Sequence, residues 1–447
     1  MRVRGLVLAL VVLAALAGGI YWSVRAKKEQ AAKPSPETPE ILNIPADQFT
    51  RFELRRRDEE PVLLEKASNG RWEMTSGPKW PVDQDTAESI ARTLSSLTAS
   101  RLVEEKAENL EEFGLAKPAV ELVFTTKDGK TRKLLIGDES PAGSGSFVKL
   151  EDDARVFIIA PYNKASLDRT ARELRDKRLL TFDPDKLSRL ELTAKGQTIE
   201  FGKNARNEWQ IIRPRPLRAD ASTVEDLIRR LQDARMDIYT TEEDDKKASA
   251  AFARTPLTAL ARVTDAAGTQ QLEVRCDKDR NCYGKSSVVE GVHKVESYLA
   301  DSMDKRLDDF RNKRLFDFGF SEPSSVEIRD GEKRAVYRKE PDRWMQDSTQ
   351  VDASAVNTLV DRLRMLTATR FAESGFTTPV FEATVTSDSG KRVEKVLISR
   401  AGDRCYGRRE GEPSIYELDP KSLEELQKAF ADIRPYQPQQ AGKEKKK

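Results

Sequence analysis

The sequence has very few of the residues on which most catalytic and metal sites depend. It contains one histidine and three cysteines among 447 residues. The single histidine, His293, excludes histidine-rich metal sites and leaves one base for a nucleophilic dyad or triad. Its neighbours alternate as in a strand, and we interpret it as an ordinary surface histidine. No two cysteines have C-x-x-C spacing, so neither a redox motif nor a structural zinc site is expected.

A strong net charge and a large aromatic content are also missing. Lys and Arg number 77, Asp and Glu number 75, and aromatic residues make up 7% of the chain. A nucleic-acid groove needs a basic surface with interleaved aromatics, so no nucleic acid is expected as a partner. Charged residues still reach 34%, with both signs interspersed, which indicates a solvated exterior. Among so many acids, neighbouring carboxylates alone do not indicate a glycosidase.

Glycine-rich phosphate loops are absent too. Residues 128–131 read Asp-Gly-Lys-Thr, but Phe124 occupies the place of the earlier glycine that a phosphate loop requires. We interpret this segment as a hairpin turn, and the Gly/Ser-rich residues 142–146 as a loop. From these features we predict a protein without catalytic residues, bound metal or cofactor, and without an evident small-molecule substrate.

The cysteines allow two interpretations. Cys276 and Cys282 flank a five-residue polar turn and could form a disulfide across a hairpin in an oxidising compartment, which would leave Cys405 alone. Alternatively, Cys282 and Cys405 are equivalent core residues of a repeat, and all three cysteines are free thiols. The sequence leaves both alternatives open.

The N-terminal segment differs in kind from the rest of the chain. Residues 5–24 are uncharged and long enough to cross a bilayer as a helix, and basic residues flank them on both sides. We predict that residues 1–28 form a retained transmembrane anchor. A signal peptide cleaved after Ala15-Leu16-Ala17 is the alternative. Because a short N-terminal tail normally stays in the cytoplasm, residues 29–447 are expected on the extracytoplasmic side of the membrane.

Most of the remaining chain repeats. Trp72, Trp209 and Trp344 each follow a polar turn, and they are separated by 137 residues (209 − 72) and 135 residues (344 − 209). In each copy an alternating strand precedes the tryptophan, and an amphipathic helix and a turn ending in proline follow it. We interpret each tryptophan as a core anchor that packs a strand against the following helix. The prolines that close the turns are Pro118, Pro256 and Pro379.

The predicted fold class is α+β, because alternating segments joined by polar turns indicate antiparallel hairpins and no βαβ alternation is present. Each copy is expected to be an antiparallel sheet with two helices on one face. The chain then consists of three tandem repeats of this module, preceded by one transmembrane helix. The predicted segments are residues 1–28 for the anchor, 29–40 for a Pro-rich linker, 41–179, 180–315 and 316–434 for the modules, and 435–447 for a basic disordered tail.

The order of strand, tryptophan, helix, Phe-Gly-Leu-x-x-Pro turn and further strands resembles a bacterial family known only as a domain of unknown function. The matching residues are Trp72, residues 113–118 and Ile136-Gly137. The second copy departs from this pattern at residues 252–254, and the third at residues 374–376. Members of the family are typically envelope proteins anchored in the cytoplasmic membrane. They often occur beside ABC-type transport components of the kind associated with gliding motility, so the resemblance implies location and partners but no catalytic residues.

We therefore expect a non-catalytic, membrane-anchored accessory protein in the periplasm or extracytoplasmic space of a bacterium. It would contact the membrane through residues 5–24 and other envelope or transporter proteins through its modules. One alternative is a carboxylate-based hydrolase acting on envelope polymers. This would require a concave pocket in one module, with acids that the other modules lack. The other alternative is a passive periplasmic spacer or scaffold, in which one module could be deleted without loss if the reach were restored.

Overall fold

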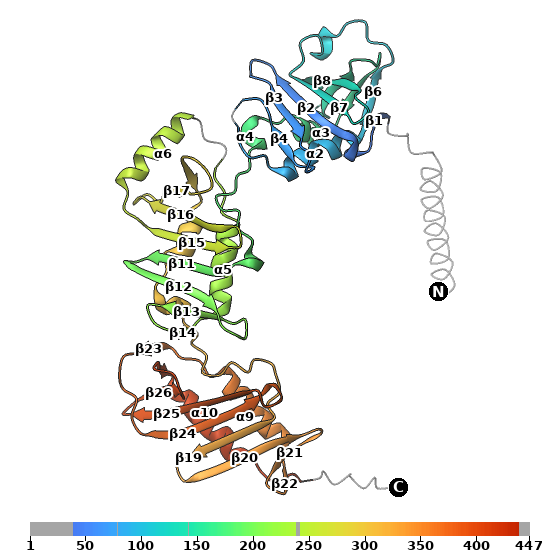
Figure 1. Ribbon diagram of the computed structural model, residues 1–447. Coiled ribbons are helices and arrows are strands. Elements are labelled where there is room, and N and C mark those ends of the chain that lie inside the picture. Colours follow the sequence, from blue (N-terminus) through green and yellow to red (C-terminus); the bar gives the residue numbers. More distant parts are fainter. Residues whose placement is uncertain (1–38, 78, 142, 238–241, 438–447) are drawn as a thin grey trace, which may run out of the picture. The chain divides into compact units, whose positions relative to one another are not determined.

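The computed structural model describes residues 39–77, 79–141, 143–237 and 242–437. The predicted anchor, residues 5–24, lies outside them, as do most of the predicted linker and tail. Within these described ranges no helix is long and apolar enough to cross a membrane. The fold is α+β with antiparallel sheets (Figure 1). It separates into two compact units, residues 1–177 and 178–447.

The first unit is built on an eight-stranded antiparallel sheet of order β4-β3-β2-β7-β8-β9-β10-β6, beside a small sheet of β1 and β5. The helix α2 buries one apolar stripe against the large sheet, as its helical periodicity predicts. The strands are β1 (Glu40–Asn43), β2 (Phe49–Arg56), β3 (Val62–Lys66), β4 (Trp72–Met74), β5 (Ser96–Thr98), β6 (Arg101–Glu104), β7 (Val120–Thr126), β8 (Thr131–Glu139), β9 (Ser146–Leu150) and β10 (Val156–Ile159), and the helices are α2 (Gln84–Ser95), α3 (Pro161–Leu167) and α4 (Ala171–Leu174).

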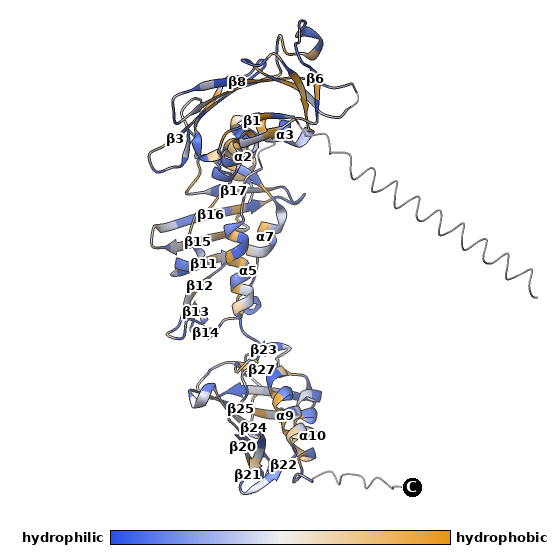
Figure 2. Ribbon diagram, turned by 90° about the vertical axis from the view of Figure 1, so that its right-hand side faces the viewer, coloured by the Kyte–Doolittle hydropathy of each residue, from blue (hydrophilic) through white to orange (hydrophobic). Residues whose placement is uncertain are grey.

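The second unit contains two further antiparallel sheets, which we call the sheets of the second and third modules. In each, the helices of the core lie on one side of the sheet (Figure 2). The second module comprises β11 (Arg189–Ala194), β12 (Gln197–Lys203), β13 (Trp209–Arg213), β14 (Leu217–Arg218), α5 (Ala221–Gln232), α6 (Glu242–Arg254), β15 (Ala259–Asp265), β16 (Gly268–Cys276), β17 (Cys282–Ser286), β18 (Val292–Val295), α7 (Ser297–Met303) and α8 (Leu307–Phe310). The third comprises β19 (Ser325–Asp330), β20 (Lys333–Glu340), β21 (Arg343–Gln346), β22 (Thr349–Val351), α9 (Ala353–Met365), β23 (Arg370–Ala372), β24 (Pro379–Ser387), β25 (Arg392–Ala401), β26 (Arg404–Arg409), β27 (Ile415–Leu418) and α10 (Pro420–Asp432).

The three large sheets have corresponding strand orders. The second is β14-β13-β12-β11-β15-β16-β17-β18, and the third is β22-β21-β20-β19-β24-β25-β26-β27-β23. In all three, the first long strand (β2, β11 or β19) lies in the middle, with its own hairpin on one side and the later meander on the other. Each meander begins near a predicted proline, because Pro118 and Pro256 lie just before β7 and β15, and Pro379 is the first residue of β24.

The three repeated tryptophans are buried at the same place in each sheet. Trp72 and Trp344 are each 1% exposed, and Trp209 is 7% exposed. The indole Nε1 of Trp72 donates to Glu88 of α2 over 2.9 Å, and that of Trp344 donates to Asn357 of α9 over 3.1 Å. Each tryptophan of this pair therefore joins its strand to the helix that follows it in the chain, through packing and a hydrogen bond.

One position on β8, β16 and β25 explains why the Phe-Gly-Leu turn does not recur. In the first copy it is Gly137, where a Cβ atom would lie 2.1 Å from the Phe113 carbonyl oxygen. In the second copy it is Arg275, whose guanidinium donates to the Phe252 carbonyl over 3.2 Å and stacks on that ring at 4.6 Å. In the third it is Ser399, whose hydroxyl accepts a backbone N–H. The turn thus lies directly against the backbone in the first copy, and a side chain holds it in the other two.

Two other segments that recur in the sequence contact each other. Residues 175–179 recur as residues 311–315, and residues 282–284 recur as residues 405–407. The leucine that ends Arg-Asp-Lys-Arg-Leu, Leu179, packs on Gly284 of β17, and its counterpart Leu315 packs on Gly407 of β26. Both leucines belong to the core of the module that follows them, whereas the predicted boundaries placed each one last in the preceding copy. Gly407 is therefore required because the Leu315 side chain occupies the space of a Cβ atom, whereas Leu179 lies 3.4 Å from that position at Gly284.

Replacing Gly407 by alanine is expected to destabilise the third module by about 1–3 kcal/mol, the usual cost of overpacking a core. The added Cβ would lie 2.4 Å from the Cδ2 atom of Leu315, which is fully buried. The matched change Gly284→Ala should cost less, because its nearest neighbours are at 3.0 Å and 3.4 Å. Hydrogen exchange resolved by mass spectrometry measures both modules within the intact chain, and equal losses in the two variants would contradict the argument.

A disulfide closes the hairpin of β16 and β17. It joins Cys276 and Cys282, which face each other directly in the register of the two strands, and Cys405 is a buried free cysteine. The turn between them is also held by Asp277, whose carboxylate accepts from the backbone and side chain of Asn281. The short loop is therefore restrained twice.

Replacing both Cys276 and Cys282 by serine is expected to destabilise the second module by about 2 kcal/mol or less. The entropy of closing so short a loop is small, and the hydrogen bonds of Asp277 keep the turn in place without the disulfide. Thermal unfolding of wild type, with and without reductant, against the double variant measures the effect. A much larger loss would mean that the disulfide supports more than its own hairpin.

The interpretation of His293 as a surface residue is wrong. The side chain is 6% exposed, because α6, a helix that the sequence analysis did not predict, packs against β18. Its Nε2 atom lies 2.9 Å from the Glu290 carbonyl oxygen. Ala248 and Phe252 of α6 form a small apolar cluster with Val292 of β18, separate from the main core of the module.

Candidate functional site: a charge network between the second and third modules

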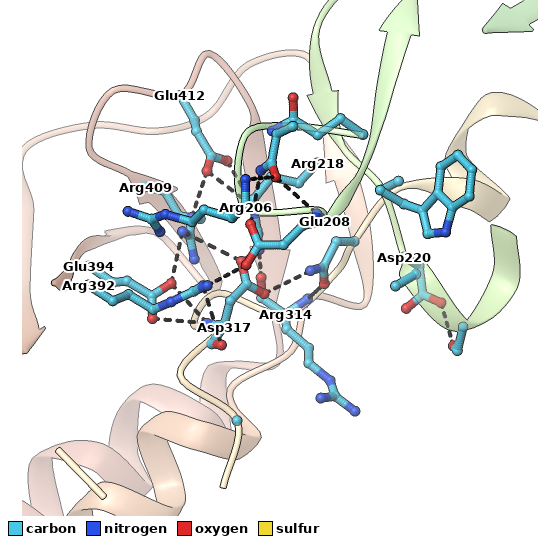
Figure 3. Close-up of a pocket in the computed structure, with 18 of the residues that line it drawn as sticks. Arg206, Glu208, Arg218, Asp220, Arg314, Asp317, Arg392, Glu394, Arg409 and Glu412 are labelled. Atoms are coloured by element: carbon cyan, nitrogen blue, oxygen red, sulfur yellow. Dashed lines mark hydrogen bonds and ion pairs between the residues drawn. The ribbon is translucent and has the colours of Figure 1, made fainter. Parts of the chain in front are cut away.

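A pocket of about 650 Å³ lies within the second unit, where the second module meets the third. The second module lines it with the β12–β13 turn and the start of α5, and the third with β25 and the β26–β27 turn (Figure 3). Among the residues singled out from the sequence, only Trp209 lines it. Its charged residues are Arg206, Glu208, Arg218, Asp220, Glu225, Arg314, Asp317, Arg392, Glu394, Arg409 and Glu412.

Arg218 of β14 is the central cation of this network. Its guanidinium lies 2.5 Å from Asp317, 3.1 Å from Glu412 and 2.9 Å from the Tyr416 hydroxyl, all of the third module. The side chain is only 15% exposed, and it also donates to the Arg314 carbonyl oxygen. One side chain of the second module is therefore enclosed by groups of the third.

A second group of charges lies entirely on the third module. The Arg409 guanidinium lies 3.0 Å from Glu394 and 2.7 Å from Glu412, and it donates to the Leu315 carbonyl oxygen. The Glu394 side chain is 4% exposed and accepts the backbone N–H of Asp317 over 2.9 Å. These residues hold the segment that leaves the second module against β25 and β26.

Two outer contacts complete the joint. Glu208, in the β12–β13 turn, forms an ion pair with Arg392 of β25. Arg311, which follows α8, is 7% exposed and lies 3.4 Å from the centre of the Phe371 ring. It also donates to the Ser414 hydroxyl over 2.9 Å. Arg218 and Arg311 of the second module are thus paired with acids or a ring of the third.

The environment keeps Arg218 and Glu208 charged near neutral pH. Burial acts to lower the pKa of Arg218, but the charges of Asp317, Tyr416 and Glu412 outweigh it and raise that pKa above its usual value. Burial likewise acts to raise the pKa of Glu208, but hydrogen bonds from Asn204 and Arg392 outweigh it and lower that pKa. A lowered carboxyl pKa stabilises the folded state at neutral pH, and the contribution is lost as the pH falls through the folded-state value.

The arrangement is better suited to holding two modules together than to acid–base chemistry. A general acid or base has to exchange its proton at working pH. Asp317, Glu394 and Glu412 each lie instead within ion-pair distance of a guanidinium. Within the described ranges of the chain, no group of three or more His, Cys, Asp and Glu side chains is arranged to hold a metal ion.

The same backbone positions are held by neutral side chains at the start of the second module. There the backbone N–H of Thr181 is accepted by Gln270, and the Leu179 carbonyl accepts from the Ser286 hydroxyl. The registers of β16 with β17 and of β25 with β26 align Gln270 with Glu394 and Ser286 with Arg409. In the third module, Asp317 and Leu315 take the places of Thr181 and Leu179. Glu394 and Arg409 take the places of Gln270 and Ser286. The charges of Glu394 and Arg409 are therefore not a property of the repeated fold.

A comparison with protein-family models identifies the chain. The model described as a domain of unknown function, DUF4340, matches residues 72–252 and again residues 209–382. The two matches together span residues 72–382, which is more than half of the chain. The chain belongs to the DUF4340 family. Searches of curated proteins and of solved structures found no match to it.

The two DUF4340 matches begin at Trp72 and at Trp209, two of the three repeated tryptophans. Each match therefore starts in one module and ends in the next, so the family model describes parts of two successive modules. The second match includes Arg218 and Asp317, whereas Glu394, Arg409 and Glu412 follow it. Much of the charge network of this DUF4340 chain thus lies outside the matched residues.

The first unit of the DUF4340 chain has a pocket at the corresponding place, of about 630 Å³. It is lined by Trp72, Trp80 and Gln84, and Gln84 both accepts from the Trp72 backbone N–H and donates to its carbonyl. The Arg175 guanidinium lies 4.6 Å from the centre of the Trp80 ring. Charged side chains also line this pocket, those of Arg71, Glu73 and Lys79, beside the Trp80 ring and the Gln84 amide.

Proposed function

We propose that this protein is a non-catalytic accessory protein of the bacterial cell envelope. In this proposal residues 5–24 anchor it in the cytoplasmic membrane, and three tandem modules project into the extracytoplasmic space. Its partners would be other envelope proteins or components of an ABC-type transport system. The corresponding strand orders of the three sheets and the two offset family matches support the tandem arrangement.

The observation that carries the proposal is the charge network of the joint. A binding scaffold needs its surfaces held in a fixed relation, because a mobile array loses conformational entropy on binding. The guanidinium groups of Arg218 and Arg311, on the second module, form contacts that hold the third module on it. The same contacts speak against the hydrolase alternative, since they occupy the carboxylates of the largest charged pocket described above.

Affinity purification of the tagged full-length protein tests the proposal. Membranes are treated with a mild crosslinker and solubilised, and bound proteins are identified by mass spectrometry. We expect transporter or envelope proteins to be recovered in defined ratio. Recovery of the protein alone, under conditions in which a known envelope complex stays intact, would contradict the proposal.

Deletion of residues 316–434 is the matched control, because it removes the third module and keeps the anchor. An accessory protein that binds through its modules should lose partners on this deletion. A passive spacer should instead regain its function when an unrelated domain of similar length replaces the missing module. The two readouts therefore separate the proposal from the spacer alternative.

A further inference from the structure

We propose that the Arg218 network is an electrostatic latch. It holds the third module in one orientation on the second, and it opens when its charge balance is broken while both modules stay folded. This inference goes beyond the proposed function, because it concerns the joint alone and needs neither membrane nor partner.

The first argument is that the two modules do not share a hydrophobic core. The apolar core of the second module ends at Phe310, and that of the third begins at Leu315. The hydrophobic effect, which dominates folding within each module, therefore contributes little across the joint. Interfaces of this polar kind between domains normally permit relative motion unless specific contacts prevent it.

The second argument concerns the backbone that crosses the joint. The Asn312 N–H donates to the Arg218 carbonyl of the second module, and the next residue, Lys313, accepts from Ala368 of the third. These two backbone hydrogen bonds do not depend on the side chains of the network. When those side chains separate, each bond still holds its end of the connecting segment on its own module. Rotation of one module relative to the other is then confined to the backbone dihedral angles between these two hydrogen bonds, at Asn312 and Lys313. A hinge of a few residues is sufficient for a large domain motion.

The third argument concerns the charges on the two sides of the hinge. Arg218 lies beside the hinge on the second module, and its partners Asp317 and Glu412 lie beyond it on the third. All three side chains are less than a quarter exposed. When one buried charge is reversed, two like charges meet in a region of low dielectric, which strongly disfavours the closed arrangement. Separation of the modules relieves this repulsion at once, whereas unfolding of either core does not.

A charge-reversal experiment on the full-length protein in detergent tests the latch. Spin labels are attached at Gln197→Cys in the second module and Lys333→Cys in the third, both exposed positions, and the distance between them is measured by pulsed electron paramagnetic resonance. We expect one narrow distance in the parent protein. Arg218→Glu and Glu412→Arg should each replace it by a broad distribution. The conservative variant Arg218→Lys keeps the positive charge beside Asp317 and Glu412 and should give a distribution much narrower than that of Arg218→Glu.

Arg206→Ala is the matched control, because Arg206 lines the same pocket but contacts the third module only through one long hydrogen bond of 3.5 Å to the Lys391 carbonyl. It should keep the narrow distance. Two results would overturn the latch: a narrow distance in both charge-reversed variants, or a distribution in Arg218→Lys as broad as that in Arg218→Glu. Hydrogen exchange supplies the second readout. Loss of protection confined to residues 310–320 supports the latch, and loss throughout a core shows that the network stabilises folding instead.

Discussion

Replacing Arg409 by methionine is expected to destabilise the third module by roughly 3–5 kcal/mol, the cost of breaking a buried ion pair on one side. The side chains of Arg409 and Glu394 are 12% and 4% exposed and lie 3.0 Å apart. Methionine fills the space of the aliphatic stem but leaves the Glu394 carboxylate in the protein interior with its backbone donor alone. Hydrogen exchange of β25 and β26 in the full-length chain, converted to free energies of opening, measures the loss.

The matched control is Arg370→Met, on the same sheet. Arg370 forms an ion pair of 2.9 Å with Glu417, but its side chain is 63% exposed. Exposed pairs contribute about 0–1 kcal/mol, so little change is expected. The double variant R409M/E394Q should recover part of the loss, because the unpaired charge is gone. If R409M destabilised the module no more than R370M does, water would have to reach the Glu394 carboxylate. The network would then not be buried.

The architecture could be predicted from the sequence because its signals are local. The spacing of Trp72, Trp209 and Trp344 marks one hairpin in each copy, and helical periodicity locates the helix that follows each of them. The α+β class with antiparallel sheets is confirmed. The helix α6 was not predicted, because the stretch around residues 242–254 is mostly polar and its few apolar residues cover one small cluster.

The charge network could not be predicted, because its members come together from different copies. Arg218 and Glu412 are 194 residues apart, and each occurs in a sequence rich in charged residues. One signal was available within the repeat itself. When Cys282-Tyr283-Gly284 is aligned with Cys405-Tyr406-Gly407, Ser286 falls on Arg409. A charged residue thus replaces a neutral one in the same strand of the two modules. Such differences between copies mark the places where a repeat has acquired a particular task.

Replacing Trp72 by alanine is expected to destabilise the first unit by about 3–5 kcal/mol, as for other large-to-small changes at buried aromatics. Trp72 is 1% exposed, stacks on Phe52 at 4.7 Å and donates to Glu88 of α2. Its loss would leave a cavity between β4 and α2. Because packing accounts for most of the lost stability, Trp72→Phe, which keeps a buried ring and removes the hydrogen bond, should destabilise the unit by only about 1 kcal/mol.

Hydrogen exchange of residues 39–177 in the full-length chain measures both variants of Trp72, and the second unit provides the internal reference. Trp80 is the matched control, since it is only partly buried and lies against the exposed side of the same pocket. Trp80→Ala should cost clearly less than Trp72→Ala. If Trp72→Phe were as damaging as Trp72→Ala, the bond to Glu88 would outweigh the packing. The repeated tryptophan would then act mainly as a hydrogen-bond donor to the helix. Trp209, whose indole N–H has no such partner among the described residues, would need a different explanation for its place in the core.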